Sequence, residues 1–157
     1  MSITRDGWFI DTYVKWAKQT IALNLGNASA GYFMVAMFDD TITPNFAQTS
    51  PAYNSAPFND GQVEGAGYDA GGQALTAVAF EPHPTADWVR WICDPLAWTG
   101  STITGAKGAL IYVPSLSNVA VLLRNFGQAY STNDGTFGLN PHPTDGLGRS
   151  RIVAPAA

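Results

Sequence analysis

The residues that could carry out chemistry are few, and the two histidines are the first candidates. His83 and His142 are the only histidines of the chain, and each stands in the tetrapeptide Pro-His-Pro-Thr, with Asp87 and Asp145 close by. A metal site requires such side chains to converge at ligand distance, and their spacing does not enforce this, because the two histidines do not share a helical face. Since each proline fixes its own φ angle and lacks an N–H donor, we expect two rigid, exposed turns and no bound metal.

A cysteine or serine nucleophile is not indicated either. Cys93 is the single cysteine, which excludes a disulfide, and it lies in an apolar run typical of a buried strand, with no paired histidine to lower its pKa. The chain has no Gly-x-Ser-x-Gly elbow of the serine hydrolases. Asp39 with Asp40 and Glu64 with Asp69 are the kind of pair that glycosidases use, but adjacent acids at a strand end more often mark its solvent boundary. We therefore expect no catalytic residue and no enzymatic activity.

The glycine-rich segment 65–72 invites comparison with a phosphate-binding loop. Such a loop requires a helix after the glycines and a Lys-Ser or Lys-Thr pair, whereas the residues that follow, 73–80, have the pattern of a strand. Tight turns with positive φ angles explain the glycines better. We expect no nucleotide and no other cofactor.

Composition narrows the class of protein. The 157 residues suit one domain, 1–157, and 46% hydrophobic residues suffice for a core. Only 13% are charged, about half of the usual ~25%, and wide neutral surfaces of this kind are often covered in an assembly. A net charge of −4 argues against nucleic acid and anionic membranes as partners. The first residues lack the apolar region of a signal peptide, and no apolar run approaches the ~20 residues that span a bilayer, so we expect synthesis as a cytosolic product.

Only residues 8–25 have a good helical period. Five apolar side chains fall at spacings of three and four residues, which places them on one helical face, and Asn24, Gly26 and Asn27 supply stop signals. These five are Ile10, Tyr13, Val14, Ala17 and Ile21. Two interpretations stay open: the face packs on a sheet of the same domain, or the segment is an arm that docks on a neighbouring molecule.

The rest of the chain has the pattern of strands punctuated by Gly, Pro and Asn. We expect a mainly β fold, an antiparallel β-sandwich or partly closed barrel with one N-terminal helix. Residues 30–126 would form the β core and 127–157 a loop-rich C-terminal segment, and the long polar loop 41–72 is a candidate contact with a partner. The predicted strands are 32–38, 73–80, 87–93, 106–113 and 118–126, with shorter ones at 135–139 and 149–153.

Two segments carry a resemblance to a known group of proteins. Gly-Tyr-x-x-Gly-Gly-x-x-Leu spans 67–75, and Ala-Lys-Gly-Ala-Leu-Ile-Tyr spans 106–112. Their order, after the helical opening and the apolar strand, resembles small virion structural proteins of tailed bacteriophages, of the capsid decoration, minor capsid or head-fibre type. The resemblance covers about residues 15–126, and the stretch after Phe126 departs from it.

The resemblance implies a role without catalysis. It implies that the chain binds the major capsid protein or other virion proteins, stabilises the shell, acts as a homo-oligomer and resides in the virion after synthesis in the host cytoplasm. One alternative is a tail or baseplate protein, or a virion protein that binds carbohydrate on the host surface. Another is a carbohydrate-binding β-sandwich, which the many Trp and Tyr residues in loops would suit.

Aromatic residues in loops or near the N-terminus are the candidate contacts with a partner, because interfaces are anchored by such side chains. The alternative is that several of them cap the core of the domain itself. The candidates are Trp8, Phe46, Tyr53, Phe58, Tyr130 and Phe137.

Overall fold

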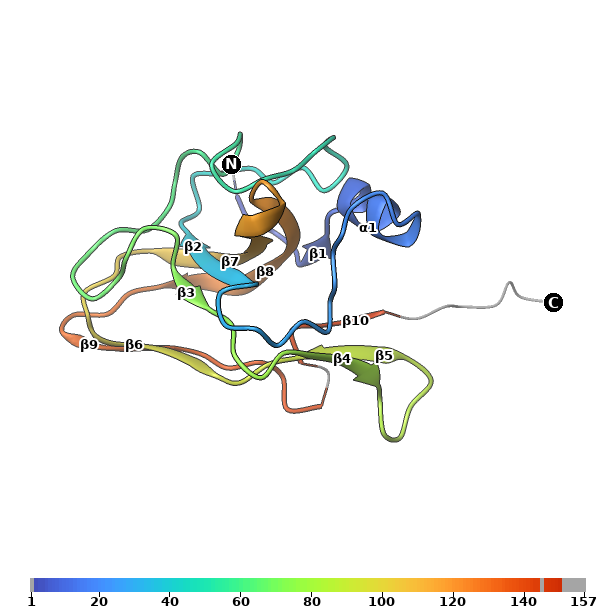
Figure 1. Ribbon diagram of the computed structural model, residues 1–157. Coiled ribbons are helices and arrows are strands. Elements are labelled where there is room, and N and C mark those ends of the chain that lie inside the picture. The colour runs from blue at the N-terminus through green and yellow to red at the C-terminus, as the bar shows by residue number, and fades with distance from the viewer. Residues whose placement is uncertain (1, 145, 151–157) are drawn as a thin grey trace.

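The computed structural model describes residues 2–144 and 146–150, and its central feature is a five-stranded antiparallel sheet (Figure 1). The strands in spatial order are β1 (Gly7–Trp8), β8 (Val119–Tyr130), β7 (Ala106–Val113), β2 (Met34–Phe38) and β3 (Gln73–Ala74). Below it in Figure 1 lie two smaller antiparallel sheets. They are formed by β6 (Leu96–Ser101) with β9 (Gly135–Leu139), and by β10 (Gly148–Ser150), β5 (Val89–Ile92) and β4 (Ala79–Pro82). The predicted mainly β class with one N-terminal helix is confirmed: the fold is sandwich-like, and its sheets do not close into a barrel.

The central sheet is buried on both faces, which explains the uninterrupted apolar run that predicted β2. Successive side chains of a strand point to opposite faces, so Val35 and Met37 join the core between the sheets, while Ala36 and Phe38 join a second core on the other face. The core between the sheets also holds the buried Trp91 of β5. A strand covered on one face only would have alternated apolar with polar residues.

The second core is covered by the long loop 41–72, which crosses the upper face of the central sheet (Figure 1). Ile42, Phe46 and Phe58 are buried there. The loop returns to the sheet at Gly72, whose φ is +77° and where a Cβ would lie 1.6 Å from the carbonyl oxygen of Val35. The segment predicted as a free contact loop is therefore in large part a cover for the domain's own sheet.

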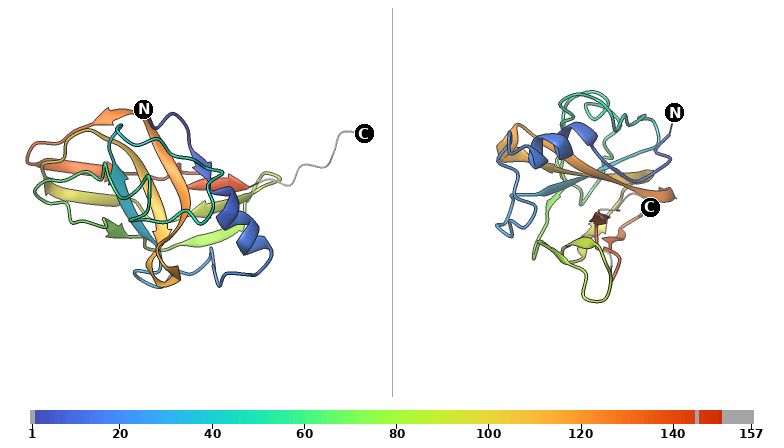
Figure 2. Two further views of the ribbon diagram at one scale, coloured as in Figure 1. Left: turned by 90° about the horizontal axis from the view of Figure 1, so that it is seen from above. Right: turned by 90° about the vertical axis from the view of Figure 1, so that its right-hand side faces the viewer.

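The helix is shorter than the predicted 8–25. Residues 7–8 form β1 and pair with β8, and the helix, α1, spans Ile10–Ala17. It ends well before the expected stop signals, because Gln19 adopts a left-handed backbone with φ +57°. Figure 2 shows α1 at one edge of the central sheet, next to β1 and β8.

The face that α1 turns to the sheet is not the apolar stripe, so the first of the two interpretations of that stripe does not hold for the helix itself. Its one buried residue is Thr12, whose hydroxyl donates to the carbonyl oxygen of Ala120 at 2.7 Å. The preceding Phe9 is fully buried, and the N–H of Ile10 donates to the carbonyl oxygen of Phe46 at 2.9 Å. These contacts fix how the helix is rolled about its axis, so Ile10, Tyr13, Val14 and Ala17 of the predicted stripe are exposed. Ile21, the fifth residue of the stripe, lies beyond the end of the helix and packs partly buried against the core between the sheets.

Other predicted strands differ in their bounds. The run 73–80 is divided between β3 and β4, which belong to different sheets, because Ala77 turns the chain with φ +50°. β8 continues four residues past the predicted Phe126, to Tyr130. The predicted strand 149–153 corresponds to β10, and its last three residues lie outside the described ranges. A 3-10 turn, η1 (Pro114–Leu116), joins β7 to β8.

Candidate functional site

The environment of Cys93 does not favour a nucleophile. The side chain is half-buried, and burial, with the charge of Asp94 as a smaller cause, raises the pKa of its thiol to about 12. Nucleophilic chemistry requires the thiolate, and near neutral pH this group stays protonated. Within the described ranges, no three His, Cys, Asp or Glu side chains gather as metal ligands would.

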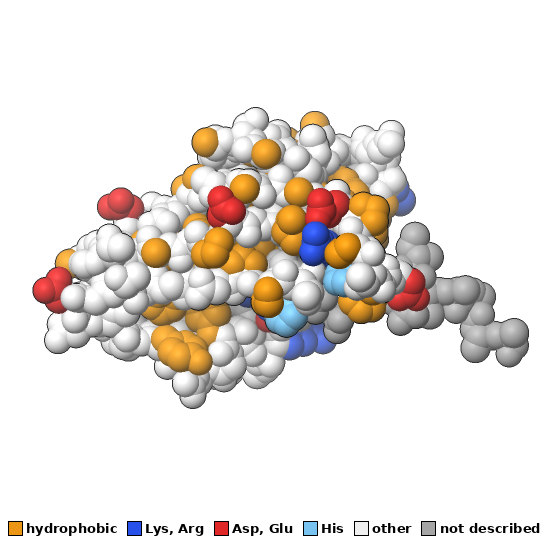
Figure 3. Space-filling view, turned by 90° about the horizontal axis from the view of Figure 1, so that it is seen from below, with side chains coloured by type: hydrophobic (Ala, Val, Ile, Leu, Met, Phe, Trp, Pro, Cys, Tyr) orange, Lys and Arg blue, Asp and Glu red, His pale blue; other side chains and the backbone are white. Residues whose placement is uncertain are grey.

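The two Pro-His-Pro-Thr segments form similar turns on the underside of the molecule, where both histidine side chains are visible (Figure 3). In each, the Nδ1 atom of the histidine lies within hydrogen-bond distance of the backbone N–H two residues on, at 3.2 Å for His83 and 3.4 Å for His142. Arg90 connects the two: its Nε donates to Glu81 at 2.9 Å and its Nη1 to the carbonyl oxygen of Thr144 at 3.3 Å. Arg90 therefore joins the β4–β5 hairpin to the C-terminal segment, through the carbonyl oxygen of Thr144.

The carboxylates of Asp39 and Asp40 serve as backbone anchors. Asp40 accepts hydrogen bonds from the Ser2 hydroxyl at 2.8 Å and the Ile3 N–H at 2.9 Å, which hold the pKa of its carboxyl below the usual range. Asp39 accepts from the N–H of Thr41 at 2.9 Å. Each carboxylate thus ties down its own neighbourhood, the N-terminus for Asp40 and the turn after β2 for Asp39.

The structure separates the six predicted contact residues into three groups. Phe46, Tyr53, Phe58 and Phe137 are buried in the domain's own cores. Trp8 is half-buried and stacks on Trp91, with ring centroids 5.3 Å apart. Tyr130 is exposed. The first four rings cap the domain itself, which is the alternative interpretation of these residues.

Large hydrophobic side chains on the surface are concentrated at two places. Within the part of the chain whose side chains are described, four are exposed: Ile10 by 57%, Tyr13 by 38%, Val14 by 41% and Tyr130 by 44%. The first three share α1 and are called here the α1 face. Exposed apolar side chains gathered in one place mark interaction sites more often than scattered ones do.

A groove continues the α1 face toward the β4–β5 hairpin. Its volume is about 380 Å³. Trp16 of α1 meets Phe80 of β4 edge to face, with ring centroids 5.9 Å apart, and so joins the two walls. Its lining is apolar apart from one carboxylate: Tyr13, Trp16, Phe80, Pro82, Ala86, Asp87, Trp88 and Val89.

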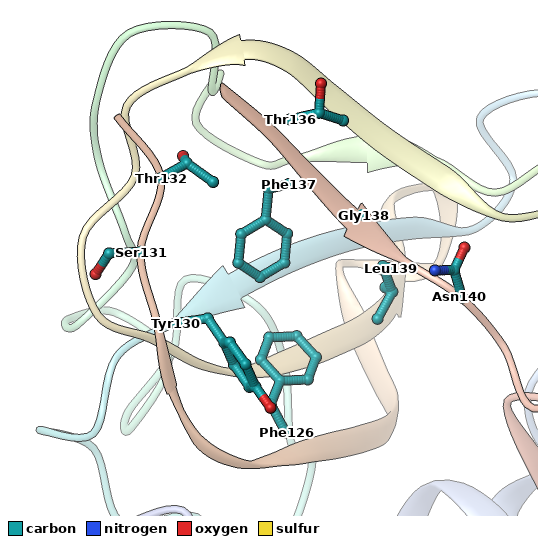
Figure 4. Close-up of a pocket in the computed structure, with 9 residues that line it drawn as sticks. All are labelled: Phe126, Tyr130, Ser131, Thr132, Thr136, Phe137, Gly138, Leu139 and Asn140. Atoms are coloured by element: carbon teal, nitrogen blue, oxygen red, sulfur yellow. The ribbon is translucent and has the colours of Figure 1, made fainter. Parts of the chain in front are cut away.

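The second place is a pocket between β8 and β9, here the β8–β9 pocket (Figure 4). The two strands follow each other in the chain but belong to different sheets. They diverge from the loop 131–134 and leave a pocket of about 450 Å³. It is lined by Phe126, Tyr130, Ser131, Thr132, Thr136, Phe137, Gly138, Leu139 and Asn140.

Three aromatic rings form one side of the β8–β9 pocket. Phe126 lies between the other two, with its ring centroid 6.4 Å from that of Tyr130 and 5.9 Å from that of Phe137. Phe137 is buried against Trp98, whereas Tyr130 stands exposed at the rim. Hydroxyl and amide groups complete the lining, and none of the nine residues is charged.

Sequence reasoning found these two surfaces only in part. It named Tyr130 and Phe137 as aromatic candidates but placed Phe126 inside a core strand. For α1 it identified the apolar stripe and left its direction open between the domain and a neighbour. A usable signal for the pocket was the β9 sequence Gly-Thr-Phe-Gly-Leu, because glycines beside an aromatic residue leave room around its ring.

Two further observations were made on the chain. No helix in the described part of the chain has the length and apolarity needed to cross a bilayer. In comparisons with protein-family models, curated proteins and solved structures, nothing was found to match this chain.

Proposed function

We propose that this chain is a non-enzymatic structural protein of a tailed-phage virion, a capsid decoration or minor capsid protein that binds and stabilises the shell. The observation that carries the proposal is the α1 face. Ile10, Tyr13 and Val14 are exposed on a helix that the domain holds rigidly by its opposite side. The resemblance in segments 67–75 and 106–112 supplies the virion setting.

The α1 face suits a protein partner. Tyr13 stands between Trp8 and Trp16, with ring centroids 6.4 Å and 5.4 Å away, so it is held in place before binding. Pre-ordered aromatic side chains lose little conformational entropy on association and are common anchors of interfaces. The partner we propose is the major capsid protein, and further copies of this chain would bind around it as a symmetric homo-oligomer.

The neutral surface supports the same role. Charge repulsion keeps soluble monomers apart, and this chain has 8 basic and 12 acidic residues among 157. A surface with so few charges can be covered by neighbours without leaving many buried ions unpaired.

Cosedimentation with empty shells of the parent virion tests the proposal. The wild-type protein should pellet with the shells, and its mass in solution, measured by light scattering, should exceed that of a monomer. The variant Tyr13→Ala should bind at least about tenfold more weakly, as expected for an interface anchor. Tyr130→Ala removes the other exposed aromatic and is the matched control, with unchanged binding.

Two results would contradict the proposal. A wild-type protein that neither self-associates nor pellets with shells is not a decoration protein. Equal binding by Tyr13→Ala and wild type would show that the contact with the shell does not involve the α1 face. Antibody labelling of intact particles then separates a head position from a position in the tail or baseplate.

A further inference from the structure

The β8–β9 pocket has a composition that narrows its ligand. Its volume of about 450 Å³ lies within the range of small-molecule sites, roughly 300–1,000 Å³. Aromatic rings occupy one side, and the uncharged polar residues Ser131, Thr132, Thr136 and Asn140 lie around them at the rim, with the hydroxyl oxygens of Ser131 and Thr136 on the side away from the rings (Figure 4). The ligand must therefore offer both a flat apolar surface and several neutral polar groups.

The polar groups at the loop end of the pocket are fixed in position. The Ser131 hydroxyl oxygen accepts from the N–H of Gly105 at 3.0 Å, and that of Thr132 accepts from the N–H of Ile103 at 3.1 Å. The Ser101 hydroxyl lies 3.0 Å from the Thr132 hydroxyl. A hydroxyl whose oxygen is held in this way can still turn its O–H toward a ligand, so the site is ordered before binding.

Gly138 adds access to the backbone. β9 pairs with β6 on one side, and in an antiparallel ladder alternate residues direct their N–H and C=O groups away from the partner strand. Since Gly138 has no side chain to shield this edge and lines the pocket, backbone groups of β9 can also meet a polar ligand.

We propose that the β8–β9 pocket binds a neutral sugar, one end of a glycan chain. The apolar face of a pyranose ring stacks on Tyr130 and Phe126, Phe137 forms the floor, and the sugar hydroxyls exchange hydrogen bonds with Ser131, Thr136 and Asn140. Anionic sugars are excluded, because no basic side chain lines the pocket.

Other ligand classes fit the pocket less well. A purely aliphatic ligand would leave the hydroxyl and amide groups without hydrogen bonds, at a cost for each buried group. An extended peptide could add to the edge of β9, but the loop 131–134, which joins β8 to β9, bounds the pocket at one end and leaves little length for strand pairing.

The site does not depend on the docking of α1. Sugar binding is a property of the isolated protein, whereas docking requires shells, so either proposal can fail while the other holds. On a particle with many copies, weak single sites would add up to strong attachment through multivalency.

A glycan panel tests the sugar proposal directly. The wild-type protein is applied to immobilised neutral glycans, to sialylated and uronic-acid glycans and to extended peptides, and hits are titrated with methyl glycosides by NMR. We expect binding among the neutral glycans, with chemical-shift changes centred on residues 126–140.

Matched variants identify the site. Tyr130→Ala should weaken binding at least tenfold, because it removes the exposed stacking ring without opening a core cavity. Thr136→Val, which keeps the shape and removes the hydroxyl, should weaken it several-fold. Tyr13→Ala changes an equally exposed tyrosine elsewhere and should bind as wild type does, and melting temperatures confirm that each variant is folded.

The outcomes separate clearly. A lack of binding to every neutral glycan overturns the proposal, as does binding that Tyr130→Ala leaves unchanged. Preference for the acidic glycans or for the peptides also overturns it and assigns the pocket to that other class of ligand.

Discussion

The helix α1 and the loop 41–72 lie side by side on the same face of the central sheet and use their aromatic and apolar side chains in opposite ways. The loop is polar in sequence, yet Phe46 and Phe58 are buried beneath it. The helix has an apolar stripe, yet Ile10 and Val14 of that stripe are exposed. The two segments are joined where the N–H of Ile10 donates to the carbonyl oxygen of Phe46 at 2.9 Å.

The difference teaches that periodicity tells which side chains share a face but not which way the face points. On the upper face of the central sheet, the side chains of the loop pack with Phe9 and Ile3 in the second core. Only a small contact remains for α1, and Thr12 makes it with a hydrogen bond to Ala120. The helix is thereby held in place while Ile10, Tyr13 and Val14 of its apolar stripe stay exposed.

The largest expected effect comes from the loop. Phe58 is 1% exposed and packs edge to face on Phe9, at 5.6 Å between ring centroids. Phe58→Ala should lower the free energy of unfolding by about 3–5 kcal/mol, measured by urea denaturation. Asn59→Ala, the exposed neighbour, is the control and should stay within about 0.5 kcal/mol of wild type. A small loss for Phe58→Ala would mean that the loop is a loose cover rather than core.

A smaller loss is expected where α1 touches the sheet. Thr12→Val keeps the shape of the side chain but leaves the carbonyl oxygen of Ala120 buried without its hydroxyl donor, which should cost about 1–3 kcal/mol. The same urea unfolding experiment measures this loss. Thr12→Ser keeps the hydroxyl and should cost less than Thr12→Val. Equal losses in the two variants would show that packing, and not the hydrogen bond, holds the helix.

The exposed stripe should be nearly neutral for stability. Ile10→Ser and Val14→Ser should each change the free energy of unfolding by about 0.5 kcal/mol or less, since neither side chain leaves a cavity. Were these residues part of the core, each loss would be several times larger, and the contrast between helix and loop would disappear. Urea denaturation of the two single variants beside Phe58→Ala gives the comparison in one experiment.

The smallest effect concerns the ionic contact between the two segments. Asp11 of α1 pairs with Lys15 at 2.7 Å and accepts from the N–H of Ser50 in the loop at 2.8 Å. The hydrogen bond from Lys15, and then that from Ser50, lower the pKa of the Asp11 carboxyl. Because the pKa of Asp11 is lower in the folded state than in the unfolded state, its contribution to the free energy of unfolding is complete above the unfolded pKa of about 3.9. That contribution is lost as the pH falls through the pKa of the folded state.

The expected size of that loss is at most about 0.3 kcal/mol, since the pair is near the surface and four residues apart on one helix. An NMR titration should show the Ser50 amide shifting with a midpoint below pH ~3.9, and Asp11→Asn should abolish that titration. A midpoint at or above the ordinary aspartate value would mean that the contact does not favour the charged carboxylate.

Much of the β core could be predicted from the sequence because it follows local patterns. The apolar run 32–38 and the alternating run 135–139 predicted β2 and β9 from their side chains alone. The element bounds that were predicted wrongly depend on single positive-φ residues that are not glycine, so the sequence gives no signal for them. Ala77 and Gln19 both have positive φ angles, and they divide a predicted strand and shorten the predicted helix.

The two candidate surfaces were harder to predict because they depend on distant contacts. The β8–β9 pocket exists because two strands that follow each other in the chain join different sheets. The sequence of neither strand reveals which sheet it joins. The direction of the α1 face depends on how Phe9 and Phe46, 37 positions apart in the sequence, pack together at 5.3 Å between ring centroids. The virion role stays a prediction from the resemblance and from these surfaces.

The short outer strands of the central sheet have a consequence for solubility. β1 and β3, the two edge strands, have two residues each, whereas β8, the neighbour of β1, has twelve. Backbone bonds from the flanking loops cover part of the remaining edges: the N–H of Phe9 donates to Val121 at 3.1 Å, and that of Val63 to Met37 at 3.0 Å. Exposed strand edges are templates for aggregation, and short or covered edges prevent it. In a protein with so little charge to keep its copies apart, the central sheet thus offers few free backbone groups to a second copy.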